Sequence, residues 1–201
     1  MGAMPFSELQ PAAGQRLLAR AKAGDAAACR ALVERHQGRV FAQLRGLLRP
    51  AGREAWVEDL AQETFLRAFR GLDGFTGDVD RALGAWLLTI ATRVGLNELR
   101  KNRPRASELN TIEETLCTRR DDPSVNGHVI GRGIDDAVRE LPPAYQAAFL
   151  LRELHGFEYA EIATALEIDL GTVKSRLSRA RSRLREALTR ARTKTEDEHG
   201  T

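Results

Sequence analysis

The segment EYAEIATALEIDLGTVKSRLSRARSRLREAL, residues 158–188, has the pattern of two helices joined by a tight turn. Its second helix is crowded with cations, since residues 171–192 hold eight basic side chains and one acidic side chain. This gives a local net charge of +7 in a chain whose total net charge is +3. Such a concentration of positive charge on one helix is typical of a surface that binds a polyanion.

The second helix separates its apolar and polar residues onto opposite faces. Its apolar stripe, at steps of three or four residues, consists of Val173, Leu177, Ala180, Leu184 and Leu188. The candidate DNA-contacting residues lie on or beside the opposite face: Thr172, Lys174, Ser175, Arg176, Ser178, Arg179 and Arg183. Small polar side chains allow close approach to base edges, and flanking cations can reach phosphates.

Three residues near the turn favour a helix-turn-helix. Small Ala163 permits a close helix crossing, Ile168 can fill the turn, and Asp169 can cap the second helix. The alternative is a solvated basic helix on the surface of a bundle. That alternative leaves the capped turn and the serine-centred face unexplained, so we favour a helix-turn-helix that binds duplex DNA.

Composition indicates an all-α protein. Hydrophobic residues make up 42% of the 201 residues, strand formers are scarce, and we find no clear period-two alternation of apolar residues. No apolar run approaches the ~18–20 residues of a membrane-spanning helix, so we expect no direct membrane insertion. The lack of an export signal and of metal-ligand spacing around Cys29 and Cys117 is typical of a reduced, cytoplasmic chain.

Proline and glycine positions divide the chain into two small helical domains joined by an extended linker, the second being the helix-turn-helix domain. The predicted order is a flexible N-terminal tail (1–14), a helical domain (15–104), the linker (105–133), the helix-turn-helix domain (134–192) and a flexible C-terminal tail (193–201). Within the first domain, apolar periodicity predicts helices over 15–22, 26–48, 59–72 and 86–101.

An acidic part of the first domain offers a candidate protein-docking face. Residues 54–80 carry seven carboxylates and two arginines. The exposed side of the predicted helix 59–72 holds Asp59, Gln62, Glu63 and Arg70. This side either docks on a basic protein surface or is an ordinary solvated face, and the spacing alone leaves both open. Asp59 and Glu63 have no further ligand beside them, so we expect no metal.

The predicted helix 86–101 is basic on one side. Its candidate DNA-contacting residues are Thr92, Arg93, Asn97, Arg100 and Lys101. A glycine-rich loop with Phe75 precedes this helix. The cations could bind the phosphates of an unpaired DNA strand while a pocket in the loop holds a displaced base. The alternative is that the arginines are merely on the surface and Trp86 belongs to the core. We favour the core for Trp86 and nucleic acid for Arg100 and Lys101.

The sequence lacks the motifs of catalysis. It has no glycine-rich phosphate loop, no HExxH motif and no serine in a strand-turn-helix setting. Its four histidines are scattered. We therefore expect no enzyme activity, no cofactor and no small-molecule substrate.

The motifs of the acidic helix, the basic helix and the helix-turn-helix together resemble a known family, the extracytoplasmic-function (ECF) alternative sigma factors of bacterial RNA polymerase. EDLAQETF (58–65) looks like that family's core-polymerase-binding helix, and residues 85–101 are similar to its segment for the promoter −10 element. LPPAY (141–145) together with GTVKSRLSRAR (171–181) resembles its −35-reading domain. The resemblance covers about residues 15–190.

The resemblance implies a transcription initiation factor with three contacts. The docking helix would meet the clamp of the core RNA polymerase β′ subunit, the basic helix would hold −10 promoter DNA, and the helix-turn-helix would read the −35 duplex. It also implies an anti-sigma factor that keeps the protein inactive. Two departures stand out: Arg93 where the family often has Asn, and Asp169-Leu170 in place of the more usual Pro-Val.

A stand-alone helix-turn-helix regulator, acting without polymerase, is the second hypothesis. The acidic helix around Asp59 and the long linker have no role under that hypothesis.

Overall fold

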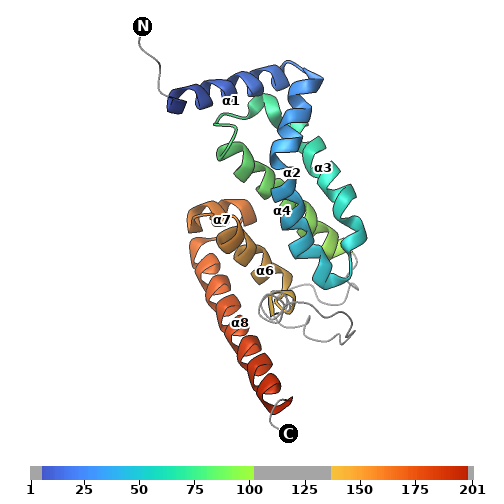
Figure 1. Cartoon of the computed structure of the whole chain (residues 1–201), viewed down its shortest axis with the longest axis vertical. Helices are drawn as coiled ribbons and strands as arrows, with labels where there is room; N and C mark the ends of the chain where they lie inside the picture. Colours follow the sequence, from blue (N-terminus) through green and yellow to red (C-terminus); the bar gives the residue numbers. More distant parts are fainter. Residues whose placement is uncertain (1–5, 102–136, 199–201) are drawn as a thin grey trace.

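The computed structural model describes residues 6–101 and 137–198, with side chains described for 13–101 and 137–190. The described residues form helices and no strand, which confirms the predicted all-α class (Figure 1). The predicted linker of residues 105–133 lies outside the described residues, as do Cys117 and the ends of both predicted tails.

The described part of the first domain contains four α-helices, with short 3-10 turns between them: α1 (Phe6–Lys22), α2 (Ala26–Leu48), α3 (Val57–Gly71) and α4 (Ala82–Lys101). Figure 1 shows α2 running through the middle of this domain, and α2 packs on each of the other three. Its N-terminus is capped by the Asp25 carboxylate, which accepts hydrogen bonds from the backbone N–H groups of Ala27 (2.9 Å) and Ala28 (3.2 Å).

The first helix is longer than the sequence predicts, because α1 begins at Phe6 and not at Gln15. It continues through Pro11 and Gly14, two residues that normally interrupt helices. Gly14 lies against Val79 of the loop before α4, so this part of α1 is held by a contact with a segment far away in the sequence.

In the described part of the second domain, helical residues 137–139 are followed by α6 (Pro143–Phe149), a π-helical turn (Leu150–Leu154), α7 (Tyr159–Leu166) and α8 (Leu170–Glu198). Pro143 opens α6 at its first helical position, where the missing N–H removes no hydrogen bond. Glu167 ends α7 in the left-handed region, with φ of 56°. The helix-turn-helix predicted for residues 158–188 is formed by α7 and α8.

The two domains pack directly against each other. Helix α4 contacts α6 and α7, and α2 contacts α6 and the π-helical turn. Leu88 of α4 is fully buried, and the core cluster to which it belongs is otherwise built from the second domain, including Leu151, Phe157 and Ile162. Leu47 of α2 is buried in the same way against Ala147 and Leu150. The apolar core is therefore continuous from one domain to the other.

Candidate DNA and protein interfaces

The N-terminus of α8 is held by Asp169. Its carboxylate accepts hydrogen bonds from the backbone N–H of Thr172 at 2.8 Å and from the Thr172 hydroxyl at 2.6 Å. These hydrogen bonds lower the pKa of the Asp169 carboxyl below its ordinary value, and the bond from the hydroxyl has the largest effect. The predicted cap is thus present. It also engages the hydroxyl of Thr172, one of the candidate DNA contacts.

The face of α8 opposite its apolar stripe is open to solvent. Lys174, Ser175, Ser178 and Arg179 are exposed, and Arg176 and Arg183 are half-buried. The stripe itself lies in the core, where Val173, Leu177 and Ala180 have no exposed surface. The predicted phase of the helix is therefore correct through Leu184, and four small or basic side chains share the exposed face of α8.

Leu188, the last residue of the apolar stripe, is 36% exposed, so the buried part of the stripe ends at Leu184. The small core cluster at this end of the domain includes Leu184 and Ala187, packed with Ala137 and Leu141. Leu188 lies beyond that cluster because the C-terminal part of α8 projects past the helices on which it packs (Figure 1).

Arg181 faces its own domain and not the open side of α8. Its guanidinium lies 2.8 Å from the Glu153 carboxylate and 3.5 Å from the Tyr159 hydroxyl. These contacts join α8 to the π-helical turn and to α7. Arg181 therefore belongs to the scaffold of the helix-turn-helix.

The acidic face on α3 is accessible. Asp59, Gln62 and Arg70 are exposed, and Glu63 forms an ion pair with Arg67 at 2.7 Å. The hydrogen bond from Arg67 lowers the pKa of the Glu63 carboxyl. Four charged or polar side chains predicted for docking therefore share one accessible surface.

Beside this acidic face lies an apolar groove between α2 and α3 that the sequence alone did not reveal. It encloses about 300 Å³ and is lined by Val33, Gln37, Phe41, Glu58, Ala61, Gln62, Phe65, Leu66 and Phe69. Leu66 is 44% exposed, although it is a large apolar residue. The sequence could have indicated that Leu66 is exposed, because it lies four residues after Gln62 and therefore on the same face of the helix. The wall of the groove formed by α2 could not be predicted, because it depends on tertiary packing.

On α4, Thr92 is buried, which corrects its prediction as a DNA contact. Its hydroxyl donates to the Leu88 carbonyl at 2.7 Å and accepts from the Gln43 side-chain amide at 2.9 Å. Thr92 has no exposed surface because the helical phase turns it toward α2. By contrast, Asn97, Arg100 and Lys101 are exposed at the end of the helix.

Arg93 binds the second domain. Its Nε donates to the Ala165 carbonyl and its Nη2 to the Thr164 carbonyl, each at 2.9 Å, and Nη1 lies 2.9 Å from the Glu167 carboxylate. Since the last carbonyls of a helix lack intrahelical partners and carry negative partial charge, a guanidinium is well suited to cap them. In this structure Arg93 caps α7, so it does not occupy the DNA-contacting position predicted for it.

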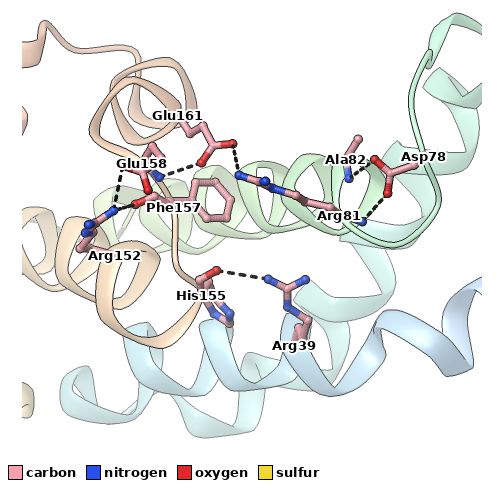
Figure 2. Close-up of polar contacts among 9 residues, drawn as sticks. All are labelled: Arg39, Asp78, Arg81, Ala82, Arg152, His155, Phe157, Glu158 and Glu161. Carbon is pink, nitrogen blue, oxygen red and sulfur yellow. Dashed lines mark hydrogen bonds and ion pairs between the residues drawn. The ribbon is translucent and has the colours of Figure 1, made fainter. Parts of the chain in front are cut away.

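Further polar contacts across the domain boundary appear in Figure 2. Arg81, which directly precedes α4, reaches Glu161 of α7 at 3.8 Å, and Arg39 of α2 donates to the His155 carbonyl at 3.5 Å. Glu161 also accepts from the backbone N–H of Glu158 at 2.7 Å, as part of the capping box of α7. The N-terminus of α7 is thereby ordered at the point where it meets the first domain.

Two histidine side chains are shielded from water to different extents, since His36 of α2 is buried and His155, after the π-helical turn, is half-buried. Among the described residues, neither His36 Nε2 nor His155 Nε2 has a hydrogen-bond partner. Burial, together with the nearby charge of Arg39, lowers the pKa of His155 to about 4. Burial also lowers the pKa of His36. Both imidazoles are therefore neutral near pH 7.

Among the side chains that the structure describes, those of residues 13–101 and 137–190, no three or more histidines, cysteines, aspartates or glutamates are grouped so as to hold a metal ion. Within these ranges, no helix combines the length and apolar character needed to cross a membrane.

Comparison with family models gives two matches in the order of the two domains. The model for sigma-70 region 2 matches residues 32–105, and the model for sigma-70 region 4 matches residues 132–184. The first match spans most of α2 to α4, including the groove and the basic helix. The second contains the helix-turn-helix up to Leu184.

Sequence relatives agree with these matches. The chain is 34% identical over 177 residues to the ECF RNA polymerase sigma-E factor of Escherichia coli K12, covering 83% of this chain and 90% of the relative. It is 33% identical over 160 residues to the ECF RNA polymerase sigma factor SigE of Mycolicibacterium smegmatis, covering 78% of this chain and 60% of that longer relative.

Two solved structures are similar in fold. One is CnrH in complex with the cytosolic domain of CnrY, with a TM-score of 0.60 and 25% identity over 88% of this chain and 97% of that chain. The other is the sigma factor RpoE in complex with the anti-sigma factor NepR from Bartonella quintana, with a TM-score of 0.57 and 25% identity over 78% of this chain and 94% of that chain.

Proposed function

Because this chain belongs to the ECF family of RNA polymerase sigma factors, we propose that it binds the β′ clamp of core polymerase and directs initiation at promoters through −10 and −35 contacts. The observation that carries this proposal is the presence, in one chain, of an accessible acidic docking face and a helix-turn-helix with an open basic face. A stand-alone regulator is not favoured, since residues 32–105 match region 2.

The groove between α2 and α3 is the proposed site for the clamp. Its lining is almost entirely apolar, and Leu66 stands exposed within it. Glu58 and Gln62 line the same groove, and Asp59 is exposed nearby on α3. An amphipathic helical partner with an apolar stripe and basic edges fits such a surface. The exposed Asp59, Gln62, Glu63 and Arg70 would then set the orientation of the complex.

Promoter contacts are assigned to two separate basic surfaces. On α4 the candidates are Asn97, Arg100 and Lys101, whose exposed side chains can follow the phosphates of an unpaired strand. On α8 the candidates are Lys174, Ser175, Arg176, Ser178, Arg179 and Arg183. The short serine side chains allow the helix to approach base edges, while the longer basic chains reach phosphate.

An anti-sigma factor is the proposed regulator. Its support comes from the solved relatives, since RpoE is bound to the anti-sigma factor NepR, and CnrH is bound to the cytosolic domain of CnrY. A protein that covered both the α3 groove and the α8 face would block polymerase and promoter together.

Run-off transcription tests the proposed function. Purified core polymerase with this chain should initiate at a defined start site on a promoter with suitable −10 and −35 elements, whereas core alone should not. Initiation should be lost when Asp59 and Glu63 are both replaced by Lys. Tight operator binding by the free chain, without specific initiation on any cognate core, would instead establish the stand-alone regulator.

A further inference from the structure

We propose that Lys22 of α1 is a positioning residue for −10 recognition. It holds the loop between α3 and α4, residues 72–81, in the shape that receives an unpaired base. The inference rests on the proposed −10 contact and deepens it, because base selection then depends in part on a side chain that does not itself touch DNA.

The Lys22 ammonium donates hydrogen bonds to two backbone carbonyls of this loop, at 2.7 Å to Phe75 and at 3.2 Å to Asp73. The two carbonyls are two residues apart, so one cation fixes the direction of both peptide groups. Lys22 is half-buried in the last turn of α1, 51 residues before Asp73 in the chain. Hydrogen bonds from a charged donor are stronger than those between neutral groups, so Lys22 is an effective restraint on this turn.

The backbone held by Lys22 determines where the Phe75 ring lies. That ring stacks on Trp86 of α4, with the ring centroids 5.2 Å apart and an angle of 24° between the planes. Gly77 packs on the same ring, because a Cβ atom built there would lie 3.0 Å from Phe75 Cζ and 2.8 Å from Ala82 Cβ. No side chain fits at residue 77, so a shift of the Phe75 backbone would disturb both contacts of the ring.

The two ends of the loop are fixed without Lys22. Leu72 and Val79 belong to the core of the first domain and are 3% and 2% exposed. Before α4, the Asp78 carboxylate accepts a hydrogen bond from the backbone N–H of Arg81 at 2.6 Å. Loss of the Lys22 ammonium should therefore loosen the middle of the loop while the domain stays folded.

The middle of the loop is accessible to a nucleic-acid base. Asp73, Gly74 and Thr76 are exposed, which leaves backbone groups and one hydroxyl open to hydrogen bonding. A flipped base is read by hydrogen bonds to its Watson–Crick edge. Such a site selects its ligand only when its groups are held to within about 0.5 Å of the productive geometry. Lys22 supplies that restraint, since its ammonium binds loop carbonyls.

Fluorescence quenching on the full chain tests the restraint without polymerase or DNA. Trp56 is 47% exposed, so Trp56→Phe gives a background in which Trp86 is the remaining tryptophan. In that background, Lys22→Met should raise the quenching of Trp86 by acrylamide, because the Phe75 ring no longer stays over it. Lys22→Arg should restore the lower value, since a guanidinium also donates to carbonyls. Equal quenching in the Lys22→Met and Lys22 proteins would overturn the positioning role.

Run-off transcription on a panel of −10 variants tests the effect on base selection. Lys22→Met should lower the preference for the best base at the unpaired position by roughly tenfold, the effect expected when charged hydrogen bonds are lost. Lys22→Arg should keep most of the preference. Arg16→Met is the matched control, because it removes an exposed cation from the same helix, and it should leave the preference unchanged.

The outcomes separate this inference from the proposed function. If Lys22→Met weakened initiation equally on every −10 sequence, Lys22 would be a phosphate contact or a general stabiliser, and the inference would be overturned. An unchanged base preference in a complex that initiates correctly would also overturn it, while the proposed function stood. A wild-type chain that never initiated with its cognate core would overturn both, because no −10 contact would remain for Lys22 to position.

Discussion

The hydroxyl of Tyr145 on α6 accepts a hydrogen bond from Nη1 of Arg179 on α8 at 3.0 Å. Arg183 makes a cation–π contact with the ring of the same tyrosine, with its guanidinium carbon 5.6 Å from the ring centroid. Tyr145 is only 2% exposed and its position is fixed by the core. One buried residue thus restrains two arginines that are proposed to face −35 DNA, which lowers the conformational entropy they lose on binding.

Tyr145→Phe should weaken binding of the −35 duplex by up to roughly fivefold, because it removes about 1 kcal/mol of hydrogen bonding while keeping the ring. The measurement is a titration of labelled −35 duplex at fixed salt, with circular dichroism as the check on folding. In an Arg179→Ala background the tyrosine substitution should have no further effect. Additive losses in the double variant would contradict the positioning role.

Arg179→Ala should cost about 1–3 kcal/mol of discrimination between −35 sequences if Arg179 reads a base edge. Lys174→Ala is the comparison, since a phosphate contact should weaken all sequences equally and reduce the salt slope. Competition between −35 variants at several salt concentrations separates the two outcomes. Equal losses on every sequence would reduce Arg179 to a phosphate contact.

Leu66→Glu should weaken binding to core polymerase at least tenfold, because it places a charge in the apolar groove between α2 and α3. The fold should persist, since Leu66 is already 44% exposed. Affinity for core can be measured by fluorescence anisotropy of labelled sigma factor. Asp73→Lys provides a control on an exposed residue of the same domain, and equal affinities for Leu66→Glu and the wild type would remove the groove from the interface.

Thr92→Val should lower the free energy of unfolding by about 1–3 kcal/mol, because it leaves the buried Gln43 amide without its acceptor. Thr92→Ser retains the hydroxyl and should cost less. Denaturant unfolding measures both. Thr92→Val and Thr92→Ser should not differ in promoter selectivity, although only the second keeps the hydroxyl. If Thr92→Val were as stable as the wild type and lost only −10 recognition, the original prediction of a DNA contact would be restored.

Acidification should destabilise the protein through His155. The pKa of His155 is about 4 in the folded chain, below its ordinary 6.5, so the unfolded chain binds more protons in that window. The contribution of neutral His155 to the free energy of unfolding is therefore fully present above pH 6.5 and is lost as the pH falls toward 4. His155→Leu should flatten this dependence in denaturant titrations, although His36, whose pKa is also lowered, leaves part of it. An unchanged pH slope would exclude His155 as the cause.

Local sequence patterns predicted the parts of the fold that depend on neighbouring residues. The cap at Asp169 and the apolar stripe of α8, buried through Leu184, follow from spacing within one helix, and both are present. The motifs also led correctly to the family. Promoter and polymerase contacts of individual residues stay predictions, because the structure contains neither partner.

The sequence by itself determined an all-α chain with a helix-turn-helix and an acidic helix, because helical periodicity and capping are local properties. Only the tertiary structure decided that Thr92 pairs with Gln43, that Arg93 caps α7, and that Leu88 is covered by the second domain. Periodicity says which face of a helix is apolar or charged. Which surface covers that face depends on contacts between residues far apart in the chain.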